Sequence, residues 1–242
     1  MKISFVVPAF NEEKVIVGCL QSIKEAARSF TAKSWTYELI VCNNNSTDRT
    51  AELALSEGAH VVFEPVNQIG RARNKGASAA TGDWLIFVDA DSHANPGLFG
   101  DVAEIIERGQ HIAGGATVDL DEFYLVPHVV VMFWNILSRV AHCAAGSFIF
   151  CERRAFEIIG GFNNNLYASE ELDLSRRLNR LARREGKKRL TILHHHPLVT
   201  STRKFHLYSY REHGKFLLRT ISRLGRTLND RKECFPWYDG RR

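Results

Sequence analysis

Two aspartates end an apolar run in the stretch "WLIFVDADS", residues 84–92. Asp89 and Asp91 are separated by a single residue, and a carboxylate that loses its water needs a cation or several hydrogen-bond donors. Mg²⁺ and Mn²⁺ use one or two protein carboxylates and leave the other positions to phosphate and water. The alternative is a helix N-cap followed by a turn aspartate in "DSHANPG". The pair therefore predicts a divalent-metal corner or the start of a helix.

Two polar loops come after other strand-like runs. "PAFNEE" (8–13) comes after "KISFVV", and "NNNSTD" (43–48) comes after "YELIVC". Their side chains and open backbone amides suit a base, a ribose and a diphosphate. Arg71, Arg73 and Lys75 add positive charge just before the strand that carries Asp89.

"SEELDL" (169–174) supplies a candidate base. Glu170 and Glu171 are expected in the first turn of a helix, where the helix dipole stabilises an anion and keeps it ionised as a general base. The alternative is an acid that serves only the helix. Asp173 is the reserve candidate, or an ion-pair partner of Arg176 or Arg177.

"HHHPLVTSTRK" (194–204) is a second dense cluster. In a strand, His194 and His196 point the same way, so one of them, with His196 preferred, could complete the metal site. A solvated triplet or a structural histidine is the alternative. Beyond it, Thr200, Ser201, Arg203 and Lys204 are candidates for a clamp over a diphosphate.

The elements that must position these residues alternate in type. Apolar runs predict strands at 2–10, 37–45, 59–65 and 83–92, and the segments between them have helical spacing over 11–30, 46–58 and 70–82. This order predicts an α/β protein with a mostly parallel central sheet and helices on both faces. The loops after the first, second and fourth strands should then open onto one edge. Asn11 and either Ser46 or Thr47 are the expected helix N-caps.

After residue 100 the pattern is looser. It predicts a helix (101–109), a strand (111–120), an apolar and mostly helical segment (121–142), a strand, short helix and Gly-Gly turn (145–162), a helix capped by Ser169 (169–186) and a last strand (189–197). The Gly114-Gly115 and Gly160-Gly161 pairs indicate tight turns or close backbone approach. We expect a catalytic domain over 1–204, with halves at 1–100 and 101–204. The basic amphipathic tail, 205–242, should pack on the domain or lie at a membrane surface.

Composition limits the class of protein. The 242 residues are 45% apolar, enough for one α/β core. The most apolar stretch, "FYLVPHVVVMFWNIL", is interrupted by Pro127, His128 and Asn135 and falls short of the ~20 residues of a membrane span, so a water-soluble protein is expected. Five scattered cysteines without a CxxC pair predict reduced thiols and a cytoplasmic location.

Charge is uneven along the chain. Residues 171–242 hold 19 Lys+Arg against 7 Asp+Glu. Solvated amphipathic helices explain this excess, and so would an anionic substrate, the inner face of an anionic membrane, or nucleic acid, which we do not expect as a partner. No G-x-G-x-x-G comes after the first strand and no G-x-x-x-x-G-K-[ST] occurs, so neither a dinucleotide fold nor a P-loop is supported.

Taken in order, "FVVPAFNEE", "IVCNNNSTDRT", "GRARNKGASAATGDWLIFVDADS", "GSFIFCERRAFEIIGGF" and "SEELDLSRRL" resemble family 2 of the glycosyltransferases, of GT-A fold, over about residues 3–180. The resemblance implies transfer of a sugar from a nucleotide-diphosphate donor, with inversion at the anomeric carbon and with Mg²⁺ or Mn²⁺. It leaves the acceptor open among a glycan, a lipid-linked acceptor and a small molecule, in an envelope polysaccharide or glycolipid pathway. The oligomeric state is also left open.

The resemblance also assigns residues. The first loop would line the nucleotide, Asn43 stands where the family has an aspartate that accepts from the base, and Glu171 stands where it has an aspartate as general base. An amide donates as well as accepts, so uracil, guanine and thymine donors all stay open. The expected donor-site residues are Pro8, Ala9, Phe10, Asn11, Glu12, Asn43, Arg71, Arg73, Asn74, Asp89, Ala90 and Arg203, and the expected metal ligands are Asp89, Asp91 and His196.

Two rival functions make different predictions. A sugar-phosphate nucleotidyltransferase of similar fold needs a Gly-rich, Lys-containing phosphate loop after the first strand, which "PAFNEE" is not. A non-catalytic protein that binds nucleotide sugar or nucleic acid would use the basic C-terminal third, and Glu171→Gln would then leave every activity unchanged. The Q-x-x-R-W segment of processive synthases is absent, which favours transfer of single sugars.

Overall fold

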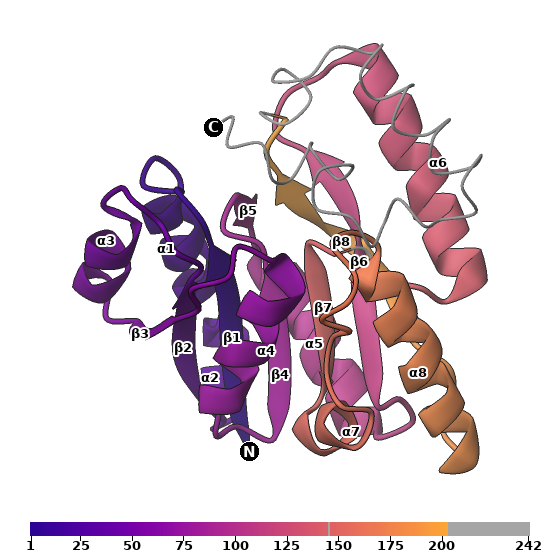
Figure 1. Ribbon diagram of the computed structural model, residues 1–242. Helices are drawn as coiled ribbons and strands as arrows, with labels where there is room; N and C mark the ends of the chain where they lie inside the picture. Colours follow the sequence, from indigo (N-terminus) through magenta and orange to yellow (C-terminus); the bar gives the residue numbers. More distant parts are fainter. Residues whose placement is uncertain (145, 203–242) are drawn as a thin grey trace.

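The computed structural model describes residues 1–144 and 146–202. Within these residues the strands form one eight-stranded sheet (Figure 1). They are β1 (Lys2–Ala9), β2 (Thr36–Asn43), β3 (His60–Phe63), β4 (Trp84–Val88), β5 (Ser92–His93), β6 (Ala113–Leu120), β7 (Phe148–Glu152) and β8 (Thr191–Thr200). Their order across the sheet is β3-β2-β1-β4-β7-β6-β8-β5.

Helices cover both faces of this sheet. They are α1 (Ile16–Ala26), α2 (Arg28–Thr31), α3 (Thr50–Ser56), α4 (Ile69–Ala79), α5 (Pro96–Arg108), α6 (Leu125–Ala141), α7 (Arg153–Ile158) and α8 (Glu170–Arg184). Alternation along β1 divides the core, because Phe5 and Val7 join a cluster with α1, α2 and α5 while Val6 joins one with α4, α7 and α8. Each such side chain contributes about 1.5–3 kcal/mol by its burial.

Strand direction reverses at β7. The four strands β3, β2, β1 and β4 are parallel, β7 is antiparallel to both β4 and β6, and β6 is parallel to β8. The short β5 at the edge is antiparallel to β8. The expected α/β architecture is therefore confirmed, and the antiparallel β7 is the part that the sequence pattern did not predict.

The carboxyl ends of β1, β2 and β4 meet at one edge, as expected, and we call segments 10–12, 44–48 and 89–91 the carboxyl edge. The Asn11 backbone amide donates to Ser46 Oγ (3.0 Å), and the Glu12 backbone amide donates to Thr50 Oγ1 (2.8 Å). On the third segment, the Asp91 carbonyl accepts from the Ser201 amide (3.1 Å), so the end of β8 reaches the same edge.

Two expected helix starts are wrong. Asn11 has a positive φ of 53° and its side chain accepts from the Thr47 amide (2.8 Å), while α1 begins at Ile16. The second of these helices, α3, begins at Thr50, whose amide donates to Asp48 Oδ1 (3.0 Å). Polar side chains that a sequence pattern assigns to caps are used here to join two loops.

The helix-cap interpretation of the aspartate pair is also wrong. Asn95 is the N-cap of α5, where its Oδ1 accepts from the Leu98 amide (2.9 Å), and Pro96 comes next in the first turn. Ser169 does precede α8, but it has a φ of 61° and makes no side-chain capping bond. The role of Asp89 and Asp91 is therefore something other than capping.

The glycine pairs mark close approach and turns, as expected. A Cβ on Gly114 would overlap the Phe150 ring, and one on Gly115 would overlap Ala144. Gly160 and Gly161 have φ values of 77° and 70°, which glycine adopts without strain.

Several sequence predictions concern residues outside the described part of the chain. These are the clamp residues Arg203 and Lys204, Cys234, and the tail 205–242. The cysteines of the described part, Cys19, Cys42, Cys143 and Cys151, are free thiols. In residues 1–144 and 146–202 no helix is long and apolar enough to cross a bilayer.

Candidate active site

Asp89 comes directly after β4 and is held from the side by α4. Its amide donates to the Ser147 carbonyl (3.2 Å), and its Oδ1 accepts from Arg73 Nη2 (2.8 Å). Arg73 is 1% exposed. Its helix can approach β1 closely because Gly76 lies against Val6, where any Cβ would overlap. The carboxylate after β4 is therefore fixed by a buried cation.

The same guanidinium reaches the start of α8. Arg73 Nη1 donates to Glu170 Oε1 (2.6 Å), Nη2 donates to the Gly146 carbonyl (2.7 Å), and Cζ lies 5.3 Å from the centroid of the Phe162 ring. Burial alone would lower the pKa of Arg73, but Asp89 and Glu170 outweigh it and raise this pKa. One charged side chain thus ties α4, β4 and α8 together.

The other polar residues of α4 bond elsewhere in the protein. Arg71 Nε donates to Glu64 Oε1 (3.2 Å). Asn74 Nδ2 donates to the Phe162 carbonyl (2.9 Å), and Asn74 Oδ1 accepts from the Phe162 backbone amide (2.8 Å). The structure brings Arg73 to the aspartates but not Arg71 or Asn74. Contact of these three with a nucleotide stays a prediction.

The two glutamates at the start of α8 differ in their partners. Glu170 is buried and bound to Arg73. Glu171 makes no side-chain hydrogen bond to any of the described residues, and a Cβ on Gly146 would lie 3.7 Å from its Cδ. Burial, followed by the charge of Glu170, raises the pKa of Glu171 to about 8.

This pKa differs from the sequence expectation. The helix N-terminus was expected to keep Glu171 ionised, but burial beside a second carboxylate has the larger effect. Asp173, the reserve candidate, pairs with Arg177 (Oδ2 to Nε, 2.8 Å), as the ion-pair alternative predicted. Glu171 is therefore the acid of this turn that is left for chemistry.

Asp91 is buried on the far side of Asp89. Near it, Ser92 Oγ donates to Thr200 Oγ1 (3.1 Å), which ties the end of β8 over this corner. The Cys19 thiol donates to the Asp89 carbonyl (3.5 Å), and burial together with the charges of Asp91 and Asp89 raises its pKa. Both carboxylates thus lie close enough to one buried thiol to act on it electrostatically.

The chemistry of these ligands fits a hard divalent cation. Asp89 has one oxygen on Arg73, which leaves its second oxygen and the Asp91 carboxylate as candidate ligands. The described residues gather no group of three or more His, Cys, Asp or Glu side chains for a metal. Two carboxylates completed by phosphate and water are a common ligand set of Mg²⁺ and Mn²⁺.

The structure does not bring His196 to this corner. Its Nδ1 lies 3.0 Å from Asp101 Oδ2, and its ring lies against Gly97 of α5. β8 continues to Thr200, which pairs with Ser92, so His196 lies further back along the strand. The ring of His194 lies against that of His195, with centroids 4.3 Å apart. The expectation failed because the strand is longer than its apolar run and bulges between Leu193 and Leu198.

The first and second loops hold the rest of the expected donor site. Pro8 and Ala9 end β1, and Phe10 and Glu12 come next on the carboxyl edge. Asn43 Oδ1 accepts from the Ser46 amide (2.9 Å), and its Nδ2 has no partner among the described residues. That amide nitrogen is suited to donate to a base carbonyl. Ala90 lies between the aspartates.

Sequence reasoning missed Asn44, which is buried below this loop. Its Nδ2 donates to the carbonyls of Glu64 and Val66 (3.1 and 2.6 Å), and its Oδ1 accepts from the Gln68 amide (3.0 Å). The only signal was one more asparagine in "NNN". This side chain joins the loop after β2 to the segment that leads into α4.

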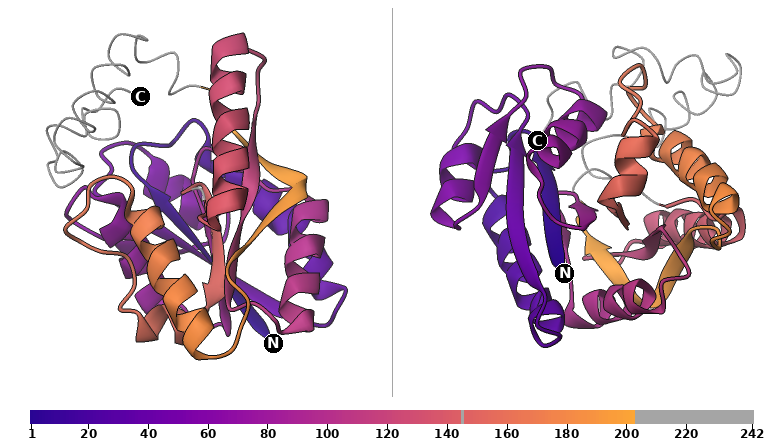
Figure 2. Two further views of the ribbon diagram at one scale, coloured as in Figure 1. Left: turned by 90° about the vertical axis from the view of Figure 1, so that its right-hand side faces the viewer. Right: turned by 90° about the horizontal axis from the view of Figure 1, so that it is seen from below.

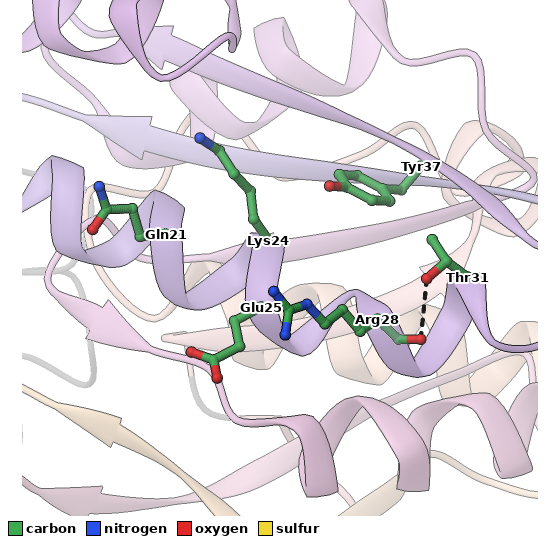
Figure 3. A pocket seen from close by; sticks show the side chains of 6 residues that line it. All are labelled: Gln21, Lys24, Glu25, Arg28, Thr31 and Tyr37. Carbon is green, nitrogen blue, oxygen red and sulfur yellow. Dashed lines mark hydrogen bonds between the residues drawn. The ribbon is translucent and has the colours of Figure 1, made fainter.

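A hollow of about 610 Å³ lies elsewhere (Figure 3). Its lining residues point in different directions from α1, α2 and the first part of β2, which is the end of β2 remote from the carboxyl edge. Lys24 among them is paired with Glu57. The hollow contains none of the candidate residues, which are Asn43, Asp89, Asp91 and Glu171.

Comparison with known proteins identifies relatives of this chain. A Mycobacterium bovis protein named an uncharacterized glycosyltransferase is 31% identical over 141 residues, 57% of this chain and 60% of that protein. The chain thus spans less than two thirds of this relative.

Solved structures share the fold. Mannosyltransferase PcManGT from Pyrobaculum calidifontis, in complex with GDP-Man and Mn²⁺, has a TM-score of 0.67 at 18% identity, over 90% of this chain and 60% of that one. S. aureus TarS 1–349 in complex with UDP-GlcNAc has a TM-score of 0.65 at 22% identity, over 84% of this chain and 59% of that one. Residues 4–157 match the family model described as Glycosyl transferase family 2. Because this match covers more than half of the chain, the protein belongs to glycosyl transferase family 2.

Proposed function

We propose that the protein transfers a single sugar from a nucleotide-diphosphate sugar to an acceptor hydroxyl, with inversion and with Mg²⁺ or Mn²⁺. The observation that carries the proposal is the Arg73 guanidinium, which bonds Asp89 at 2.8 Å and Glu170 at 2.6 Å. It joins a carboxylate pair suited to a metal diphosphate to a helix start that offers a base.

The donor would lie along the carboxyl edge. Asn43 has an unpaired amide nitrogen among the described residues for a base carbonyl, and Pro8 to Glu12 would line the nucleotide. Asp89 and Asp91 would hold the divalent cation, which supplies positive charge to the leaving diphosphate. PcManGT and TarS were solved with GDP-Man and UDP-GlcNAc, so both guanine and uracil donors remain candidates.

Glu171 is the proposed base. The acceptor oxygen attacks the anomeric carbon, the bond from that carbon to the diphosphate oxygen breaks, and its electron pair leaves with the diphosphate. The acceptor's proton passes to the Glu171 carboxylate. A pKa of about 8 makes this carboxylate a stronger proton acceptor than an ordinary glutamate, once it is ionised.

The acceptor is a hydroxyl compound, with a glycan, a lipid-linked molecule and a small molecule as candidate classes. We propose a cytoplasmic location, where the protein can contact the inner face of a membrane.

A donor panel tests the nucleotide site. Heat or thermal unfolding is followed while UDP-, GDP- and TDP-sugars are titrated with and without Mn²⁺. We expect one nucleotide to bind, more tightly with metal, and Asp91→Ala to remove the metal effect. Asp101→Ala is the matched control, because Asp101 pairs with His196 away from the corner. If no donor binds, or if binding ignores both metal and Asp91→Ala, the proposal is lost.

A further inference from the structure

Helix α6 has an apolar outward side along its whole length. Phe133 and Val140 are 67% and 74% exposed, and Leu125, Val129, Ile136 and Leu137 are also exposed. The helix stands beyond the sheet and is seen from two sides in Figures 1 and 2. Proteins in water rarely expose a continuous apolar area of this kind unless a partner covers it.

The inward side of α6 carries its polar residues together with the half-buried Val131 and Trp134. Pro127 and Ser138 are buried, and Asn135 bonds both backbone groups of Val118 (2.8 and 3.0 Å). A helix that faces water has the opposite arrangement, with its apolar side toward the core. The exposure of α6 therefore results from how its polar residues attach it to β6, and a rotation that buried its apolar side would break these bonds.

Positive charge begins beside this helix. Asp121 accepts from the Thr202 amide (2.8 Å), and the apolar stretch starts two positions later at Phe123. Residues 203–242, which come after Thr202, hold 11 Lys+Arg against 4 Asp+Glu. α6 itself contains no acidic residue, and Arg139 is exposed near its end. The apolar side thus lies next to the point where a strongly cationic segment of the chain begins.

We propose that α6 lies on an anionic lipid membrane, with its apolar side chains at the acyl boundary and the exposed Arg139, near its end, at the headgroups. An apolar helix face and a basic segment are together the two signals that give stable peripheral binding. Asp119 and Glu122 are exposed at the first end of α6, so the half from Phe133 to Val140 enters deepest.

Lipid fits this face better than protein does. From Val129 to Leu137 no polar side chain points away from the domain, since Asn135 bonds β6. A protein partner would need a polar rim around such a core. A lipid surface needs none, and its anionic headgroups complement the net positive charge of the sequence that comes after Thr202. The inference concerns binding alone and does not depend on the proposed transfer reaction.

Sedimentation of the full-length protein with vesicles tests this surface. Vesicles of phosphatidylcholine are compared with vesicles that also contain phosphatidylglycerol. Ile136→Asp is compared with Ile158→Asp, because the two isoleucines are 55% and 54% exposed, and Ile158 lies on α7. We expect binding to the anionic vesicles, about tenfold weaker with Ile136→Asp and unchanged with Ile158→Asp.

Three results would overturn the proposal. The first is no binding to anionic vesicles, and the second is equal binding by wild type and Ile136→Asp. The third is that something else covers the face. Light scattering would then report a wild-type dimer that Ile136→Asp dissociates, or thermal unfolding would show Ile136→Asp to be as damaging as a core substitution while Ile158→Asp is not.

Discussion

The carboxyl edge and the start of α8 are held in different ways. Segments of the carboxyl edge are joined by many short bonds between backbone and small polar side chains, such as Asn11 to Thr47 and Asn44 to Glu64. The start of α8 is joined to the same edge through one buried guanidinium, that of Arg73. Removing one hydrogen bond of the carboxyl edge should therefore lower stability only in part, whereas removing the Arg73 side chain should separate the start of α8 from the carboxyl edge.

Arg73→Ala is expected to have the largest effect. It leaves the buried Glu170 and the partly buried Asp89 without their cation, which costs about 3–5 kcal/mol of unfolding free energy. Denaturant unfolding measures this loss. Arg71→Ala is the matched control on the same helix, because the Arg71 side chain is 37% exposed and Glu64 keeps its bond from the Val66 backbone amide, so the loss should be about 1 kcal/mol. Equal losses in the two variants would remove the distinction between the regions.

Glu171→Gln should affect turnover rather than folding. Donor affinity should be kept while transfer falls by about 10²–10⁴-fold, because the amide cannot take the acceptor's proton. Asp173→Asn, in the same turn but in an ion pair with Arg177, should transfer within a few-fold of wild type. Wild-type turnover by Glu171→Gln would move the base elsewhere.

The raised pKa of Glu171 predicts opposite pH trends for transfer and stability. Transfer should rise with pH toward about 8, because the ionised carboxylate is the base. Stability should fall between the ordinary glutamate pKa and about 8, because over that range the folded state holds a proton that the unfolded state has released. Above that range the loss is complete.

Glu171→Gln provides the check on that pH assignment. Unfolding of the wild type and of this variant, followed across the same pH values, should diverge as the pH rises, with the variant less dependent on pH. Parallel curves for the two proteins would assign the pH dependence to other groups.

Asn44→Ala should be milder than Arg73→Ala. It removes hydrogen bonds to Glu64, Val66 and Gln68 and leaves buried backbone groups unpaired, a cost of about 1–3 kcal/mol. Donor affinity, measured by titration, should fall with it because the β2 loop loses its support. Asn11→Gly, which keeps the positive φ and loses only the bond to Thr47, should cost about 1 kcal/mol or less.

Periodicity and strand order were enough to predict the parallel part of the sheet and the position of the carboxyl edge. Alternating and buried runs located the strands, and the parallel order of β1, β2 and β4 brought Asn43, Asp89 and Asp91 to one edge. The ion pair of Arg73 with Glu170 was not predicted, because Glu170 is 97 positions away and no local pattern links the two. The position of His196 was not predicted for a related reason, because it depends on where β8 pairs with β6 and where it bulges.

The sequence pattern did not predict the orientation of α6 either. Its segment was recognised as apolar and helical, but nearly every side of the helix is apolar, so no polar face indicated which side would meet water. The bonds of Asn135 to Val118, 17 positions away, hold this side of the helix against β6.

Asn135 also has a consequence for the sheet. β6 pairs with β7 through Ala113–Gly115. Further along β6, the Asn135 side chain bonds both the backbone amide and the carbonyl of Val118, which another strand would otherwise use. Open strand edges are templates for aggregation. The side-chain amide of a helix residue therefore occupies the Val118 backbone groups, so another strand cannot bond to them.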